Sequence, residues 1–201
     1  MEVSFLKNNH HNLFENKPLQ FNKFICKDCT QKKLEYEHDS TDKIPKNILN
    51  LGYIEVSLGK YPIHVTTPVM VCPFGFNRQN NQLTLQFTNV KDNSEMNSFF
   101  RFIQELEEKQ MKYLGLTEDE NDLYLSQIRY DKKGRYDPNL LTKIPFRENR
   151  YEIEIKNKGI GCTIDNIYNF SKVQCDIYID NIWKFNDKYV CKWKVKKMLI
   201  K

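Results

Sequence analysis

The sequence predicts a mostly β protein with one inserted helix (α+β), folded as a small barrel of short antiparallel strands. Two observations support this prediction. Roughly six to eight short segments alternate apolar and polar residues, the pattern of strands with one buried face. One long segment near the middle instead repeats apolar residues at helical spacing. Many short strands around one helix are typical of a small barrel or a curled sheet.

The chain of 201 residues is expected to consist of a polar N-terminal extension, residues 1–50, and a barrel domain, residues 51–201. Within the extension, only Leu19–Ile25 has the pattern of a strand. The content of 40% hydrophobic and 13% aromatic residues is that of a globular protein. The sequence contains no apolar run of membrane-spanning length and no signal-peptide pattern, so we expect no membrane contact.

Three strands are predicted before the helix. Tyr53–Leu58 and residues 83–88 alternate regularly, as half-buried strands do. Tyr61–Cys72 is interrupted by Pro62 and Pro68, and proline cannot donate to a strand ladder. We therefore expect this strand to lie at a sheet edge or to contain a bulge.

The helical insertion is predicted near residues 94–126. Asn93 or Ser94 is the expected N-cap, and Gly115 stands where a helix usually stops. Thr117 and Glu120 form a capping box for a second, shorter helix. The apolar face of the long helix consists of Phe99, Phe100, Phe102, Ile103, Leu106 and Leu114, with Gln110 in the same stripe.

The C-terminal part is predicted to contain two hairpins. The first joins residues 140–146 and 151–155 through a polar turn at 147–150. The second spans residues 173–201, where a loop of residues 186–188 pairs Phe185 with Tyr189, and Ile179 with Val195. This register places both Trp183 and Trp193 in the core. On its outer face, this register pairs Tyr178 with Lys196, Asp180 with Lys194 and Ile182 with Lys192.

The sequence gives no motif for catalysis or for a cofactor. The six cysteines are expected to be reduced thiols, mostly buried. Cys26 and Cys29 form one CxxC pair, but a zinc ribbon needs a second pair, and His38 would supply only a third ligand. No glycine-rich phosphate loop and no Ser/His/Asp arrangement is present. We therefore expect a protein that is not an enzyme and binds neither metal nor cofactor.

Charge is unevenly distributed along the chain, although the net charge is only +5. Residues 95–122 contain 8 acidic and 3 basic residues, whereas residues 129–150 contain 7 basic and 3 acidic ones. Residues 172–201 contain 8 basic and 3 acidic ones. This segregation predicts a basic surface and a separate acidic helix.

Basic residues and aromatic residues alternate within the two basic segments. Single-stranded nucleic acid needs cations along its phosphates and flat rings on which unpaired bases stack. Without such a ligand, the same residues would form an ordinary solvated, lysine-rich face. The candidate nucleic-acid-binding residues are Arg129, Tyr130, Arg135, Tyr136, Lys143, Arg150, Tyr178, Lys184, Lys192, Lys194 and Lys196.

Residues 59–75, GKYPIHVTTPVMVCPFG, carry a family resemblance. They resemble a "kkPLyVqTPkM..PFG" pattern of single-stranded DNA-binding proteins of nucleocytoplasmic large DNA viruses (giant viruses), which look like relatives of phage single-stranded DNA-binding proteins. Later features of the sequence follow in the same order as in that family. They are the Phe-rich acidic segment 99–108, residues 136–145, Ile182-Trp183, and residues 193–195. The resemblance extends over about residues 52–200.

The resemblance implies an OB-type barrel with a helix between strands and sequence-nonspecific binding of single-stranded DNA in viral replication, repair or recombination. It implies a location at the viral replication site in host cytoplasm or nucleus, or in the virion. Replication proteins and further copies of the chain are additional candidate partners. The phage proteins end in an acidic tail, whereas this chain ends in Lys196-Lys197-Met-Leu-Ile-Lys201, and Tyr189-Val190-Cys191 occupies the position of an expected glycine. Tail-mediated partner contacts are therefore not expected.

Two alternative functions remain at this point. The first is a virion structural or scaffold protein that uses the same surface for protein contacts. The second is a zinc-stabilised transcription accessory built on Cys26 and Cys29.

Overall fold

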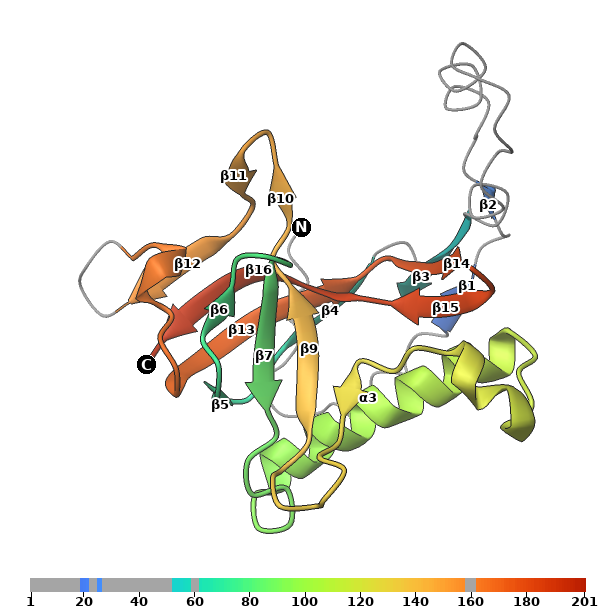
Figure 1. Ribbon diagram of the computed structural model, residues 1–201, viewed down its shortest axis with the longest axis horizontal. Coiled ribbons are helices and arrows are strands. Elements are labelled where there is room, and N and C mark those ends of the chain that lie inside the picture. Colours follow the sequence, from blue (N-terminus) through green and yellow to red (C-terminus); the bar gives the residue numbers. More distant parts are fainter. Residues whose placement is uncertain (1–18, 22–24, 27–51, 59–61, 158–161) are drawn as a thin grey trace.

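The protein is built around a closed barrel of five strands (Figure 1). The computed structural model describes residues 19–21, 25–26, 52–58, 62–157 and 162–201. A parallel pair between the first and last strands of the path closes the barrel. In order around the barrel, the strands are β16 (Trp193–Ile200), β13 (Ser171–Ile179), β5 (Met70–Cys72), β7 (Gln82–Gln86) and β9 (Asn139–Lys143).

The order of the barrel strands is that of a Greek key with one further strand. In chain order β5, β7 and β9 form an antiparallel meander, and the fourth strand, β13, returns to lie beside β5. The fifth strand, β16, fills the remaining gap between β13 and β9. This arrangement confirms the predicted fold class, an OB-like small barrel with an inserted helix.

The first barrel strand is interrupted where the prolines predicted it would be. It consists of β4 (Ile63–Thr66) and β5, and both parts pair with β13. Between them, Pro68 cannot donate a ladder hydrogen bond. The Thr67 hydroxyl occupies the gap in the ladder and accepts a hydrogen bond from the Cys175 amide at 3.0 Å. The strand therefore bends across the barrel without leaving that buried amide unpaired.

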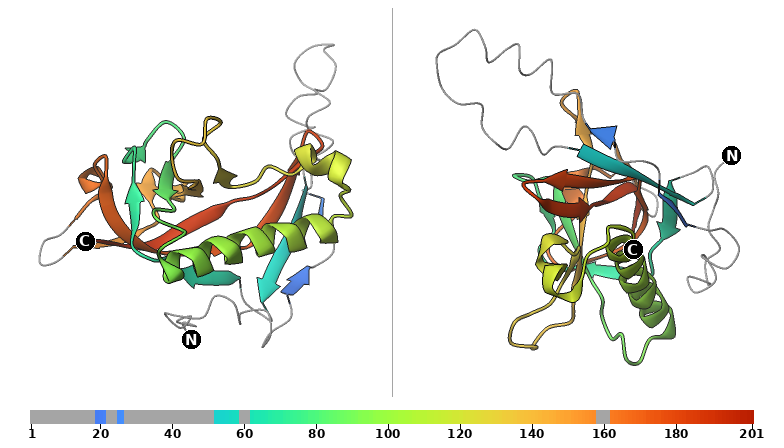
Figure 2. Two further views of the ribbon diagram at one scale, coloured as in Figure 1. Left: turned by 90° about the horizontal axis from the view of Figure 1, so that it is seen from below. Right: turned by 90° about the vertical axis from the view of Figure 1, so that its right-hand side faces the viewer.

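The long helix α3 (Ser94–Tyr113) lies along the barrel and closes one side of its core (Figure 2). The side chain of Asn93 caps it by accepting from the Met96 amide at 3.0 Å, and Gly115 follows its end with φ of +71°. The ring centres of Phe102 and Trp193 are 6.4 Å apart. The predicted apolar face is thus the face that packs on the barrel, with Met96, Phe99, Phe102, Ile103 and Leu106 all buried.

The segment after α3 differs from its prediction. The capping box of Thr117 and Glu120 is present, but it begins a 3-10 helix, η3 (Glu118–Leu123), rather than an α-helix. No residue of η3 is buried, so it has no apolar face that would stabilise a longer helix. The chain then continues into β8 (Ile128–Arg129), which pairs with β9.

The first predicted C-terminal hairpin is divided into separate elements. Its tip is the pair β10 (Phe146–Arg147) and β11 (Arg150–Tyr151), which stands away from the barrel (Figure 1). The segment after the tip, β12 (Glu154–Asn157), instead runs parallel to β16. The physical reason is that β9 already pairs with β7, β8 and β16, so it has no free edge for a returning strand.

The predicted register of the last hairpin is wrong. The connection between β14 (Asn181–Phe185) and β15 (Lys188–Cys191) has two loop residues, Asn186 and Asp187, with φ of +48° and +60°. Both residue types tolerate the left-handed region, which favours this tighter turn. Further along, Val195 lies opposite Ile177 rather than Ile179, and a register shift follows between Ile177 and Asp176.

The changed register alters the environment of three side chains. Ile182, expected on the outer face, is fully buried opposite Cys191. Trp193 is buried as predicted. Trp183 is only half-buried and packs against Tyr53, with ring centres 5.2 Å apart, so its assignment to the core is wrong.

A second sheet continues from the barrel along β14 and β15. It contains β3 (Gly52–Leu58), which pairs with β14, and two short strands from the predicted extension, β1 (Leu19–Phe21) and β2 (Ile25–Cys26). Cys29 and His38 lie outside the described residues. Among the described cysteines, Cys72, Cys175 and Cys191 are buried free thiols, and burial raises the pKa of Cys72 to about 12.

Candidate nucleic-acid interface

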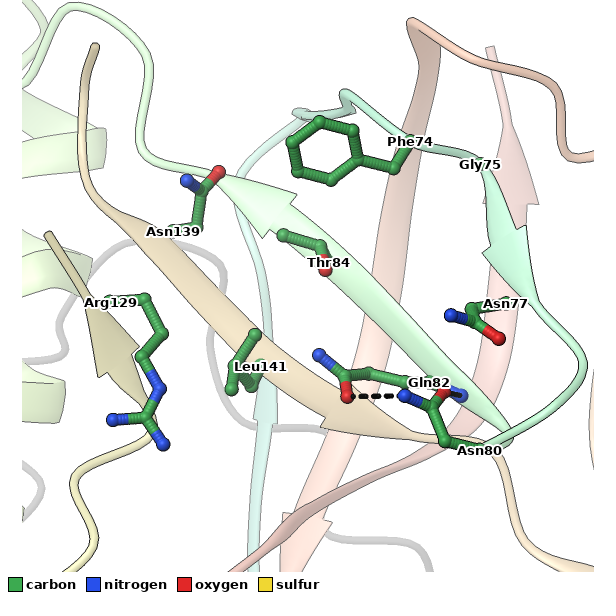
Figure 3. A pocket seen from close by; sticks show the side chains of 9 residues that line it. All are labelled: Phe74, Gly75, Asn77, Asn80, Gln82, Thr84, Arg129, Asn139 and Leu141. Carbon is green, nitrogen blue, oxygen red and sulfur yellow. Dashed lines mark hydrogen bonds between the residues drawn. The ribbon is translucent and has the colours of Figure 1, made fainter. Parts of the chain in front are cut away.

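An open pocket lies on the outer side of β7 and β9 (Figure 3). The strands alternate regularly here: Leu83 and Leu85 point into the core, whereas Gln82 and Thr84 point outward. The pocket has a volume of about 340 Å³, within the range of small-molecule sites. Its lining residues are Phe74, Gly75, Asn77, Asn80, Gln82, Thr84, Arg129, Asn139 and Leu141.

The loop between β5 and β7 forms one wall of this pocket. It contains β6 (Phe76–Asn77), which pairs back onto β7, and it presents the Phe74 ring with 69% of its surface exposed. Gly75 has φ of +61°, and a Cβ atom there would lie 2.8 Å from the carbonyl oxygen of Ile167. Glycine therefore allows this loop to pack against the turn that follows η4 (Ile164–Asn166), and so holds Phe74 at the rim.

Amide side chains supply most of the polar groups in the pocket. Asn80 donates to the side-chain oxygen of Gln82 at 3.1 Å, and its own side-chain oxygen accepts from the Gln82 amide at 3.0 Å. Asn139 has a buried side-chain oxygen that no group in the described part of the chain pairs with. The pocket lining contains no carboxylate, and Arg129 is its one charged residue.

A row of half-buried side chains leads from the pocket across the barrel. The strand registers place Gln82 beside Lys143, Lys143 beside Lys194, Lys194 beside Tyr178, and Tyr178 beside His64. We call these five residues the cross-barrel row. Since they occupy directly adjacent positions on five strands, the pocket and the C-terminal strands share one continuous outer surface.

The two cations of the cross-barrel row have protein partners. The Lys143 ammonium donates to the main-chain oxygen of Asn80, which ties the end of β9 to the pocket loop. Burial and the nearby charge of Lys192 lower the pKa of Lys143. Lys194 is bonded to Asp180 and lies 5.6 Å from the centre of the Tyr178 ring. These partners reduce the charge that the row presents to a ligand.

Tyr178 also has neighbours on both sides. It stacks on His64 with ring centres 5.3 Å apart and planes 17° apart. The predicted pairing of Tyr178 with Lys196 is wrong, because Lys194 takes that position in the shifted register. Lys192 and Lys196 are exposed, and neither takes part in an ion pair among the described residues.

The segment after β8 carries four of the predicted residues. Arg129 lines the pocket, and the neighbouring Tyr130 is 60% exposed. Tyr136 is 63% exposed, with Arg135 over its ring at 5.4 Å. Arg135 also forms an ion pair with Asp131 at 3.6 Å. All four belong to the segment that connects the pocket residues Arg129 and Asn139.

Two projecting hairpins carry the remaining predicted residues. At the tip of β10 and β11, Arg150 is exposed and lies 3.7 Å from Glu148. On β14, Lys184 lies 5.5 Å from the centre of the Tyr189 ring and 3.4 Å from Asp187. The predicted residues are therefore spread over several regions: the pocket, the segment after β8, the cross-barrel row, the exposed Lys192 and Lys196, and the two hairpins.

Sequence reasoning missed the polar residues of the pocket. Gln82 and Asn139 lie just before the predicted strands 83–88 and 140–146, and Asn77 and Asn80 lie between predicted elements. The one available signal was the Pro73-Phe-Gly-Phe76 turn, which supplies Phe74 to the rim.

In the described ranges, no group of three or more His, Cys, Asp or Glu side chains is placed to hold a metal ion. No helix in the same ranges has the length and apolarity to span a membrane. No family model matches the sequence, and no curated protein matches it significantly.

Proposed function

We propose that this protein binds single-stranded DNA with little dependence on sequence and serves viral DNA replication, repair or recombination. The observation that carries the proposal is the position of the pocket. OB-folds bind oligonucleotides on the face of their second and third strands, between the loops that follow strands one and four. In this barrel these are β7, β9, the loop of residues 73–81, and the β14–β15 hairpin.

The chemistry of this surface supports the same ligand. Exposed rings at Phe74, Tyr130 and Tyr136 offer faces on which unpaired bases stack. Arg129, Lys192 and Lys196 are exposed cations without ion pairs among the described residues, and they suit phosphates. A duplex would hide its base faces from these rings, so the arrangement favours a single strand.

The proposal is tested by fluorescence anisotropy with labelled oligo-dT and a duplex of equal length. We expect micromolar or tighter binding of oligo-dT at low salt, weakening steeply as salt rises, and weaker binding of the duplex. Equal affinity for both DNAs, or no binding at low salt, would contradict the proposal.

A virion structural or scaffold role is the second candidate, and one observation favours it. Tyr168 and Phe170 are 67% and 73% exposed on one turn, and Phe170 has φ of +64°, which is unusual for a bulky residue. Exposed apolar patches commonly mark protein contacts. Incorporation into virions without retention on oligonucleotides would support this role instead.

A further inference from the structure

The pocket on β7 and β9 has the hydrogen-bonding groups that suit a nucleobase better than a phosphate. Asn77, Asn80, Gln82 and Asn139 supply neutral amide donors and acceptors, and Thr84 supplies a hydroxyl. An amide side chain can pair with a base edge through two hydrogen bonds. Amides also contact phosphates, but the affinity for phosphates comes mainly from cations. Only Arg129 brings charge, and it lies on β8, across β9 from the β7 side of the pocket (Figure 3).

The unpaired side-chain oxygen of Asn139 is a hydrogen-bond acceptor to which a ligand in the pocket could donate. This atom is buried, and none of the described groups donates to it. A buried acceptor without a partner is unfavourable, so a ligand that offers an N–H group there gains a hydrogen bond at little desolvation cost. Every nucleobase carries an N–H or NH₂ group on its edge.

The walls of the pocket are arranged for a flat ligand. Phe74 offers an exposed ring at one side, and Thr84 and Leu141, paired across β7 and β9, form the floor. The fixed position of the Phe74 loop follows from the packing of Gly75 against residues 167–169. Stacking on a ring combined with edge hydrogen bonds is how proteins hold unpaired bases.

We propose that this pocket holds one unpaired nucleobase, stacked on Phe74 and hydrogen-bonded at its edge by Asn139 and the Asn80–Gln82 pair. Arg129 contacts the adjoining phosphate. This inference rests on the proposed function and deepens it: binding driven by phosphates is independent of sequence, and the pocket adds a base preference at one position.

The first test uses free mononucleotides, so that it does not depend on the rest of the interface. NMR spectra of the full chain are recorded with each of the four deoxynucleoside monophosphates and with 2-deoxyribose 5-phosphate. We expect the mononucleotides to shift the side-chain amide signals of Asn80, Gln82 and Asn139. Their affinities should differ by about fivefold, and the sugar phosphate should leave these signals unchanged. Equal shifts with the sugar phosphate, or no shifts with any mononucleotide, would overturn the inference.

The second test compares variants with oligonucleotides. Asn139→Leu removes the unpaired acceptor, and Gln86→Leu is the matched control, because Gln86 lies opposite Asn139 outside the pocket. Gln82→Leu is the second pocket variant, in case Asn139→Leu does not fold. We expect the pocket variants to lose the affinity differences among homopolymers and the control to keep them. Unchanged differences in a folded pocket variant would refute the base pocket even if single-stranded DNA binds. Failure of every oligonucleotide to bind while mononucleotides still occupy the pocket would refute the proposed function alone.

Discussion

Lys194 is held by Asp180, with its ammonium nitrogen 2.7 and 2.8 Å from the two carboxylate oxygens. The pair is partly buried, and it lies in the middle of the proposed DNA-binding surface beside Tyr178. A phosphate that approaches Lys194 must therefore compete with Asp180. If the surface binds DNA as proposed, the carboxylate limits that affinity as well as positioning the lysine.

Replacing Asp180 by Asn should strengthen the binding of single-stranded DNA at low salt, because Lys194 then becomes available to a phosphate. One additional phosphate contact should steepen the plot of log affinity against log salt by about 0.7. Anisotropy titrations with oligo-dT over a salt series measure both quantities. Asp122→Asn, an equal charge change on η3, is the control and should leave the slope unaltered. Weaker binding by Asp180→Asn would show that the carboxylate supports the site instead.

Replacing Phe74 by Ala should remove one stacking surface and weaken the binding of oligo-dT by about 1–3 kcal/mol. The salt dependence should stay the same, because no charge is lost. Phe74→Tyr keeps the ring and is expected to keep wild-type affinity. Titrations at one fixed salt concentration distinguish the two variants, and wild-type affinity in Phe74→Ala would count against the pocket as a base site.

Replacing Gly75 by Ala should destabilise the protein more than replacing Gly134 by Ala. Both glycines have positive φ, but a Cβ atom at Gly75 would lie 2.8 Å from a main-chain oxygen, whereas nothing lies within 4 Å of one at Gly134. The left-handed conformation alone costs about 1–3 kcal/mol in each variant. Urea unfolding measures the loss of stability in each variant. The difference between the two losses is the cost of the close contact at position 75. Equal losses of stability would contradict the described packing of the pocket loop.

The stability contribution of His64 should depend on pH. Burial, followed by the charge of Lys196, lowers the pKa of His64 below its ordinary value of 6.5. The unfolded chain therefore binds a proton at this residue more readily than the folded chain does. The contribution to stability is fully present above 6.5 and is lost as pH falls through the lower pKa of the folded state.

His64→Phe keeps a ring against Tyr178 without the titration. The free energies of unfolding of the wild type and of His64→Phe are measured at about pH 5 and about pH 8. The wild type should lose more stability than the variant on acidification, so the two values should converge or cross at the lower pH. If the difference in the free energy of unfolding between the two proteins is the same at both pH values, His64 does not cause the pH dependence of stability.

Local patterns predicted most of the elements but not their pairing. The Asn93 cap, the Gly115 stop and the break at Pro68 depend on residues adjacent in sequence, and each is present. The hairpin register depends on the two-residue turn and on the break between β13 and β14, and alternation alone cannot locate such a break. Ile182 and Trp183 have environments other than the predicted ones because the alternation of buried and outward side chains is broken between Ile179 and Ile182, where β13 ends and β14 begins.

The predicted residues are the charged and aromatic ones, because these residue types stand out in a sequence. The amide pocket could not be predicted, since Asn80 and Asn139 are brought together only when β7 and β9 pair in the closed barrel. The cross-barrel row likewise follows from strand registers that no single segment determines.

The central claim is that the outer surface of β7, β9 and the C-terminal strands binds single-stranded DNA. The most direct test is to titrate labelled oligo-dT and a matched duplex with the full chain from low to high salt, following anisotropy together with intrinsic tyrosine and tryptophan fluorescence. We predict preferential binding of the single strand, with affinity that falls steeply as salt increases. Absence of binding at low salt, or binding that does not respond to salt, would contradict the claim.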